Sequence, residues 1–182
     1  MQTMFSIPFY RFTVSGWPAK KERMLAALPE ITDKYRSPAG DTFTDFFLTS
    51  EGTSLPAYKD VVEEALSDCL DEFGEDYPAE VEISSMWFER SLRSDYHGAH
   101  NHGSLGFSAV LFLEFDSIEH KPTRFIAPFN GFYSGGLIEY RPEGVNEGTL
   151  LMWPAILLHD IEPNRSDNQR TIIAFNIRGA PQ

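Results

Sequence analysis

An apolar run with few interruptions, LGFSAVLFLEFD, occupies residues 105–116 of the chain. Short apolar runs bounded by glycine, proline or asparagine are typical of β-strands. Further runs of this kind lie near residues 81–92, 122–127, 133–140, 149–153 and 170–178. Several short strands without helical periodicity predict a mainly β sandwich or barrel, and a double-sheet jelly roll fits this set best.

The first part of the chain carries the helical patterns. Residues 18–28 begin with a proline that suits a first helical turn, and Pro29 ends the segment. From Tyr58 to Gly74, apolar residues recur at the i, i+3, i+4 and i+7 positions of an amphipathic helix. The sequence therefore predicts two N-terminal helices, with a loop between them.

The remaining N-terminal segment and the chain length complete the predicted architecture. Residues Phe5–Val14 are apolar and aromatic with a proline near the start, which favours an edge strand. The 182 residues have the length of one domain. We therefore expect a single domain over residues 1–182, in which a helical supporting region at about 15–78 packs on one sheet of a jelly-roll core at about 79–178.

Charge and cysteine content narrow the class of protein. The 27 acidic and 15 basic residues give a formal net charge of −12, which repels the phosphates of duplex nucleic acid and of anionic membranes. Cys69 is the single cysteine, which fits a reducing cytoplasm. There is no apolar run long enough to span a bilayer and no leader pattern. The sequence predicts a cytoplasmic protein without duplex nucleic-acid or membrane partners.

A cluster of histidines suggests a metal site. His97, His100 and His102 fall within six residues, and His159 follows after several predicted strands. Because side chains alternate along an extended strand, His100 and His102 can reach the same ion. Three protein ligands with open positions suit both catalytic zinc and non-haem iron, so ligand number alone does not identify the metal.

Arg170 opens the last predicted strand, which continues to residue 176. An arginine in a central strand is costly unless it is paired. Its planar guanidinium could bind a dicarboxylic cosubstrate through two parallel hydrogen bonds. A salt bridge to one of the many acidic residues is the alternative interpretation.

Several motifs stand in an order that we recognise. They are His100-x-His102, SAVLFL at 108–113, GGLIEY at 135–140, GTLLMWPAILLH at 148–159, Arg170, and IAFN at 173–176. The ordered set resembles the 2-oxoglutarate- and Fe(II)-dependent dioxygenase superfamily, and most of all the small oxygenases of this type in marine bacteria and their phages. The resemblance covers about residues 82–178 and is weak before them.

The resemblance implies a double-stranded β-helix with Fe(II) as the metal. His100 and His159 would be iron ligands, and Arg170 would bind the distal carboxylate of 2-oxoglutarate. The superfamily usually has Asp or Glu where His102 stands, so the metal is held either by three histidines or with a carboxylate from elsewhere, of which Asp95 is the nearest.

Other residues of the matching motifs are expected near the cosubstrate. The resemblance places Phe112 and Asn176 among the cofactor-binding residues. His97 is either a further ligand, a group that contacts the ligands without binding the metal, or an acid/base group for the substrate. The implied reaction consumes O₂ and 2-oxoglutarate, releases succinate and CO₂, and hydroxylates a substrate that the sequence does not identify. The sequence does not predict an oligomeric state.

Three other interpretations remain open. A three-histidine cupin that does not use 2-oxoglutarate has a similar fold, but cupins usually carry a Glu shortly after the HxH pair and residues 103–108 contain none. A jelly-roll binding or structural module without enzymatic activity is the second. A zinc hydrolase is the third, and it would need a general base such as Asp160 or Glu162.

Overall fold

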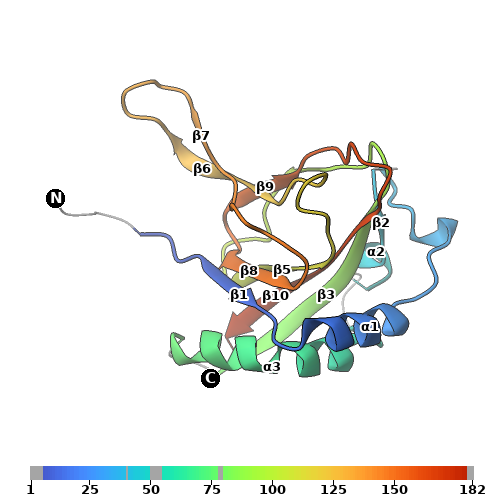
Figure 1. Cartoon of the computed structure of the whole chain (residues 1–182). Coiled ribbons are helices and arrows are strands. Elements are labelled where there is room, and N and C mark those ends of the chain that lie inside the picture. The colour runs from blue at the N-terminus through green and yellow to red at the C-terminus, as the bar shows by residue number, and fades with distance from the viewer. Residues whose placement is uncertain (1–5, 40, 50–54, 78–79, 180–182) are drawn as a thin grey trace.

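The computed structural model of the chain describes residues 6–39, 41–49, 55–77 and 80–179. A six-stranded sheet contains, in spatial order, β1 (Tyr10–Thr13), β8 (Thr149–Pro154), β5 (Phe107–Glu114), β10 (Arg170–Gly179), β3 (Val81–Ser91) and β2 (Phe43–Thr44). A four-stranded sheet contains β4 (His97–His100), β9 (Leu158–Ile161), β6 (Arg124–Asn130) and β7 (Leu137–Tyr140). Figure 1 shows the β6–β7 hairpin extending away from the rest of the protein.

The strand order confirms the predicted jelly roll. From β3 to β10 the chain passes back and forth between the two sheets, and the strands within each sheet pair antiparallel. β10 lies between β3 and β5 in the centre of the larger sheet, which explains the uninterrupted apolar run at residues 172–175 in its middle. This arrangement is a double-stranded β-helix.

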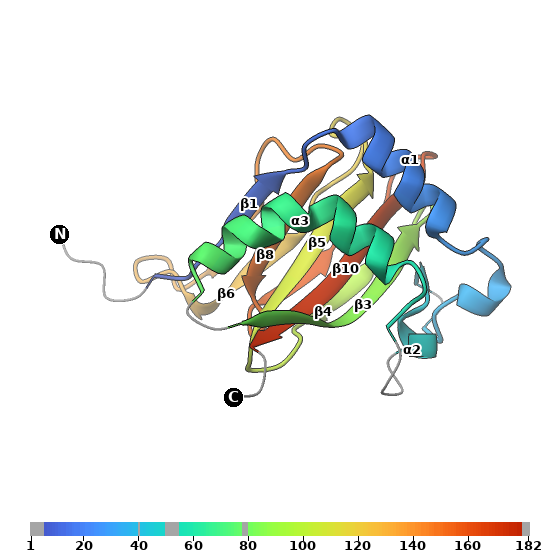
Figure 2. The ribbon, with the colours of Figure 1, turned by 90° about the horizontal axis from the view of Figure 1, so that it is seen from below.

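Two helices cover the outer face of the larger sheet, as predicted. They are α1 (Trp17–Ala27) and α3 (Lys59–Glu75), and Figure 2 shows both lying across the strands. The buried face of α3 includes Val62, Leu66 and Phe73, which belong to the same apolar cluster as Ile173 and Phe175 of β10. In the described part of the chain, no helix is both long and apolar enough to cross a membrane.

A second apolar cluster fills the space between the two sheets. Because side chains alternate along β10, Ile172 and Ala174 point into this inner cluster while their neighbours face the helices. Arg170 has the same parity as Ile172 and is 3% exposed. The inner face of the larger sheet therefore carries a charged group into the interior of the jelly roll.

Some elements differ from the prediction. The segment between the helices, expected to be a loop, contains η1 (Asp33–Tyr35), β2 and α2 (Phe46–Thr49). β2 forms because it pairs with β3, a contact between distant parts of the chain. The strand expected from Phe5 begins only at Tyr10, and as β1 it lies at the edge of the larger sheet as predicted. Phe5 and the boundary near 78–79 lie outside the described residues.

Gly106 permits a close approach between β5 and β10. Its φ is +81°, and a Cβ at this position would lie 2.1 Å from the carbonyl oxygen of Ile177. Replacing Gly106 by alanine is expected to lower the free energy of unfolding by about 3 kcal/mol or more, because backbone must move as well as adopt a strained φ. Urea denaturation measures this change.

Gly135 offers a matched control for this prediction. It also has a positive φ, +64°, but a Cβ there would meet nothing within 4 Å. Alanine at Gly135 is expected to cost only about 1 kcal/mol, which is the strain of the backbone conformation alone. Equal losses for the two variants would contradict the packing explanation at Gly106.

Candidate active site

Three histidines converge at one end of the smaller sheet. His100 closes β4 and is paired in register with His159 of β9, while His102 follows two residues after β4. One nitrogen from each ring lies within 4.8 Å of one from each of the others. His159 is buried and the other two are half-buried, so the cluster has one side toward solvent.

Hydrogen bonds orient these imidazoles. Nδ1 of His159 donates to the carbonyl oxygen of Leu157 at 2.9 Å, and Nδ1 of His100 donates to that of Gly98 at 2.8 Å. In the neutral rings each Nε2 then keeps its lone pair, as in metal-binding histidines. Nε2 of His102 and Nε2 of His159 are 3.3 Å apart. Two nitrogens bound to one metal at ~2.1 Å lie about 3.0–3.4 Å apart, so the donor set fits a shared ion.

The environment keeps these rings uncharged. Burial, together with the charges of neighbouring histidines, lowers the pKa of His159 to about 3 and that of His102 to about 4. Burial and the charge of His97 also lower the pKa of His100. Neutral imidazole is the form that binds a metal. Because these rings are already deprotonated near neutral pH, a metal ion does not have to displace a proton from them.

His97 lies beside this triad but has a different partner. Its Nδ1 is 2.8 Å from Oε2 of Glu89, and its ring stacks on that of His100 with centroids 4.1 Å apart. Burial alone lowers the pKa of His97, but the hydrogen bond and negative charge of Glu89 outweigh it, so the pKa is raised. His97 and Glu89 therefore form a coupled pair next to the three convergent imidazoles.

Asp95 is engaged elsewhere. Its two carboxylate oxygens accept hydrogen bonds from the guanidinium of Arg36, each at 2.8 Å, and one of them also accepts from the backbone N–H of Leu92. The group of His, Cys, Asp and Glu side chains that the described residues bring together for a metal is the three-histidine set. The geometry favours that set over the one with a carboxylate from Asp95.

Arg170 lies at the start of β10, with its guanidinium inside the protein. Nη1 donates to the carbonyl oxygen of Lys121 at 3.1 Å, and Nε has no partner in the described structure. No carboxylate of the described residues lies within salt-bridge distance of Arg170. The salt bridge that was the alternative interpretation of Arg170 is therefore absent among these residues. Burial lowers the pKa of Arg170 to about 10.

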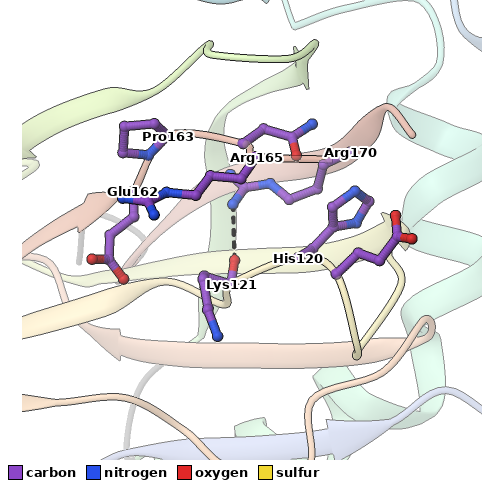
Figure 3. A pocket seen from close by; sticks show the side chains of 8 residues that line it. His120, Lys121, Glu162, Pro163, Arg165 and Arg170 are labelled. Carbon is purple, nitrogen blue, oxygen red and sulfur yellow. Dashed lines mark hydrogen bonds between the residues drawn. The ribbon is translucent and has the colours of Figure 1, made fainter. Parts of the chain in front are cut away.

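A cavity of about 290 Å³ adjoins the Arg170 guanidinium. Figure 3 shows Arg170 and Arg165 extending into this space, with Lys121 and Glu162 at its edge. Thr123, two residues after Lys121, lines the interior beside the histidines, and its buried hydroxyl oxygen also lacks a partner. A guanidinium without a carboxylate partner and a hydroxyl without a hydrogen-bond partner are donors that suit a carboxylate.

The two remaining predicted site residues have different surroundings. The carboxamide of Asn176 is bonded to Ser85 and Ser108, and Ser108 lines the interior space beside the histidines. Phe112 is fully buried in the apolar cluster between the sheets, with its ring packed edge-on against Phe115. Asn176 thus borders the site, whereas Phe112 is part of the core next to it.

The structure adds residues to the site that sequence reasoning did not select. Glu89 is the clearest, because a glutamate within the buried run of β3 signals a special environment. Asp41 and Phe46 come from the N-terminal supporting region and line a cavity beside His97 and His100. Nothing in the local sequence connects that region to the histidines.

Fold and site together define a class: a jelly roll whose interior holds three convergent imidazoles, placed so that they could share a metal ion, and a buried arginine suited to an anion. A family model described as "Putative 2OG-Fe(II) oxygenase" matches residues 85–176, which is half of the chain and contains every residue of the triad. The chain belongs to this family of 2-oxoglutarate- and Fe(II)-dependent oxygenases. The cofactors of the family, Fe(II) and 2-oxoglutarate, are those that the sequence predicts.

Solved structures of this kind share the fold. The protein is similar to HygX from Streptomyces hygroscopicus with nickel and 2-oxoglutarate bound, with a TM-score of 0.65 and 15% identity over 96% of this chain and 84% of that one. It is similar to the 2-oxoglutarate complex of the viral collagen prolyl hydroxylase vCPH from Paramecium bursaria Chlorella virus-1, with a TM-score of 0.61 and 11% identity over 95% and 96% of the two chains.

A Pseudomonas putida prolyl-4-hydroxylase has a TM-score of 0.57 and 13% identity over 96% of this chain and 94% of that chain. These similarities confirm the jelly-roll fold. No curated protein sequence matches the chain.

Proposed function

We propose that the protein is a dioxygenase that hydroxylates a substrate with release of succinate and CO₂. The observation that carries the proposal is the convergence of three neutral imidazoles in a jelly roll whose central strand β10 carries a buried arginine without a carboxylate partner. One oxygen atom of O₂ enters a substrate C–H bond and the other enters succinate. Two of the similar structures are hydroxylases by name, which is consistent with this type of reaction.

The proposed roles follow from the contacts of each side chain. His100, His102 and His159 hold Fe(II), which when bound supplies the chemistry of O₂ activation. Arg170 binds the distal carboxylate of 2-oxoglutarate, and that contact satisfies its free N–H groups. The low-dielectric interior strengthens the attraction between the guanidinium and the carboxylate.

The groups around the triad have supporting roles in this proposal. His97 is the acid/base group, because its hydrogen bond to Glu89 can hold a proton next to the substrate cavity. Asn176 links β3, β5 and β10 on the interior side, and Phe112 excludes water from beneath the site. We infer further that the helical region at about 15–78 and the core at about 79–178 act as one cytoplasmic domain without a duplex nucleic-acid partner.

Anaerobic visible spectroscopy of the wild-type protein tests the proposal. We expect a charge-transfer band when Fe(II) and then 2-oxoglutarate are added to the metal-stripped protein, because chelation by the keto and carboxylate oxygens produces it. Exposure of the complex to O₂ should then release succinate. Tight iron binding without a band would favour the cupin alternative, and no metal binding would favour a structural module.

A further inference from the structure

A cavity of about 220 Å³ lies beside the histidine triad, where the N-terminal supporting region meets the jelly roll. One wall comes from the segment that leads into β2 and α2, and the other from β3 and β4. His97, His100 and His102 border it, so a molecule bound here lies next to the metal site. This cavity is the natural place for the prime substrate.

Apart from His97, which is paired with Glu89, the charged side chains that line this cavity are acidic. Asp41 and Glu89 are its carboxylates, and its described lining contains no lysine or arginine. Asp41 accepts a hydrogen bond from the hydroxyl of Ser37. The basic residues of the chain are already few, and the formal net charge is −12. An anionic substrate would therefore be repelled both at long range and within the cavity.

The hydrogen bonding of Glu89 gives a second observation, which does not depend on the acidic character of the cavity. Glu89 is 3% exposed, and its Oε2 pairs with His97. Its Oε1 is buried without any hydrogen-bond partner in the described structure. A buried carboxylate oxygen is stable only when donors reach it. The donors that the protein lacks at this position are those that a bound ligand can bring.

The aromatic side of the cavity suits a cation on an apolar stem. Phe46 packs edge-on against Trp87, with centroids 5.1 Å apart, and Trp87 stacks on the ring of His102 at 5.4 Å. Aromatic faces attract ammonium and guanidinium groups and also pack against methylene chains.

We infer that the prime substrate presents a primary amine or a guanidinium to Asp41 and Glu89, with its apolar stem against Phe46 and Trp87. The group donates hydrogen bonds to Oε1 of Glu89, and the stem passes the iron ligands, which brings its methylene groups within reach of the reaction. This inference rests on the proposed dioxygenase function and adds to it the chemical class of the substrate.

The test uses the anaerobic protein loaded with Fe(II) and 2-oxoglutarate, and it compares four blocked amino acids by calorimetry. The probes are Nα-acetyl methylamides of lysine, arginine, norleucine and glutamate, so the norleucine probe keeps the stem of lysine without the charge. We expect the better cationic probe to bind at least about tenfold more tightly than the norleucine probe. Glutamate should bind most weakly.

Three variants connect that preference to the cavity. Asp41→Asn and Glu89→Gln remove charge with little change of shape, and each is expected to reduce the cationic preference to about threefold or less. Glu82→Gln is the matched control, because Glu82 lies on the same strand as Glu89 but is exposed on the surface. It should bind the probes as the wild type does. Asp41→Asn keeps the test valid if Glu89→Gln does not fold.

The charge-transfer band in the same samples distinguishes a failure of the substrate inference from a failure of the proposed dioxygenase function. If the band forms and the norleucine or glutamate probe binds as tightly as the cationic probes, the substrate inference is wrong while the dioxygenase function stands. Without the band both fail. Binding of 1-aminopentane as tight as that of the lysine probe would assign a small amine, and weaker binding would assign an amino-acid side chain; both outcomes support the cationic class.

Discussion

Replacing His159 by alanine is expected to weaken Fe(II) binding at least about 100-fold and to abolish 2-oxoglutarate-dependent succinate release. His159 is the buried member of the triad, and its Nε2 faces that of His102 at 3.3 Å. Alanine leaves two ligands, and water must replace the third in a site that is closed on that side. Anaerobic titration of Fe(II) against a competing chelator measures the affinity.

His120 provides the control for the loss of a buried histidine. It is 4% exposed, and its ring nitrogens bond to the N–H of Asp116 and the carbonyl oxygen of Asn168, apart from the triad. His120→Gln retains a donor and an acceptor, so it should bind Fe(II) with wild-type affinity even if it lowers the melting temperature. Unchanged Fe(II) affinity in a folded His159→Ala variant would remove His159 from the proposed ligand set.

The spacing of the histidines made the triad predictable. An HxH pair on an extended chain presents both rings to one side, and the structure brings His100 opposite His159 by pairing β4 with β9. The long strands were predictable for a related reason. The middle parts of β5 and β10 are buried on both faces, so each strand contains an uninterrupted apolar run, at residues 109–113 and 172–175.

The short elements and the walls of the substrate cavity could not be predicted in the same way. β9, with the sequence LHDI, has only four residues and no alternation of apolar and polar residues, and β2 has two residues. Their conformation depends on pairing with distant strands. Asp41 reaches the histidines only because the supporting region folds back across the end of β3, and that contact has no local signature.

Replacing Arg170 by alanine is expected to weaken 2-oxoglutarate binding by about 100-fold or more while Fe(II) still binds. Truncating one member of a buried charge pair typically costs about 2–5 kcal/mol, and ~2.7 kcal/mol corresponds to 100-fold. The protein without ligands should stay folded, because it carries this guanidinium without a carboxylate partner and burial already lowers its pKa to about 10. Titration of the charge-transfer band with 2-oxoglutarate measures the effect.

Two further variants make this prediction specific to the geometry of Arg170. Arg165 lines the same cavity but is exposed on the surface, so Arg165→Ala should leave 2-oxoglutarate affinity within about threefold of the wild type. Arg170→Lys keeps the positive charge but loses the planar fork, and it should restore only part of the affinity. Loss of affinity in Arg165→Ala, or full affinity in Arg170→Ala, would place the distal carboxylate on a different cation. An intermediate affinity of Arg170→Lys for 2-oxoglutarate, together with unchanged iron binding, would show that β10 contributes an anion site that depends on the planar shape of the guanidinium and is separate from the iron ligands.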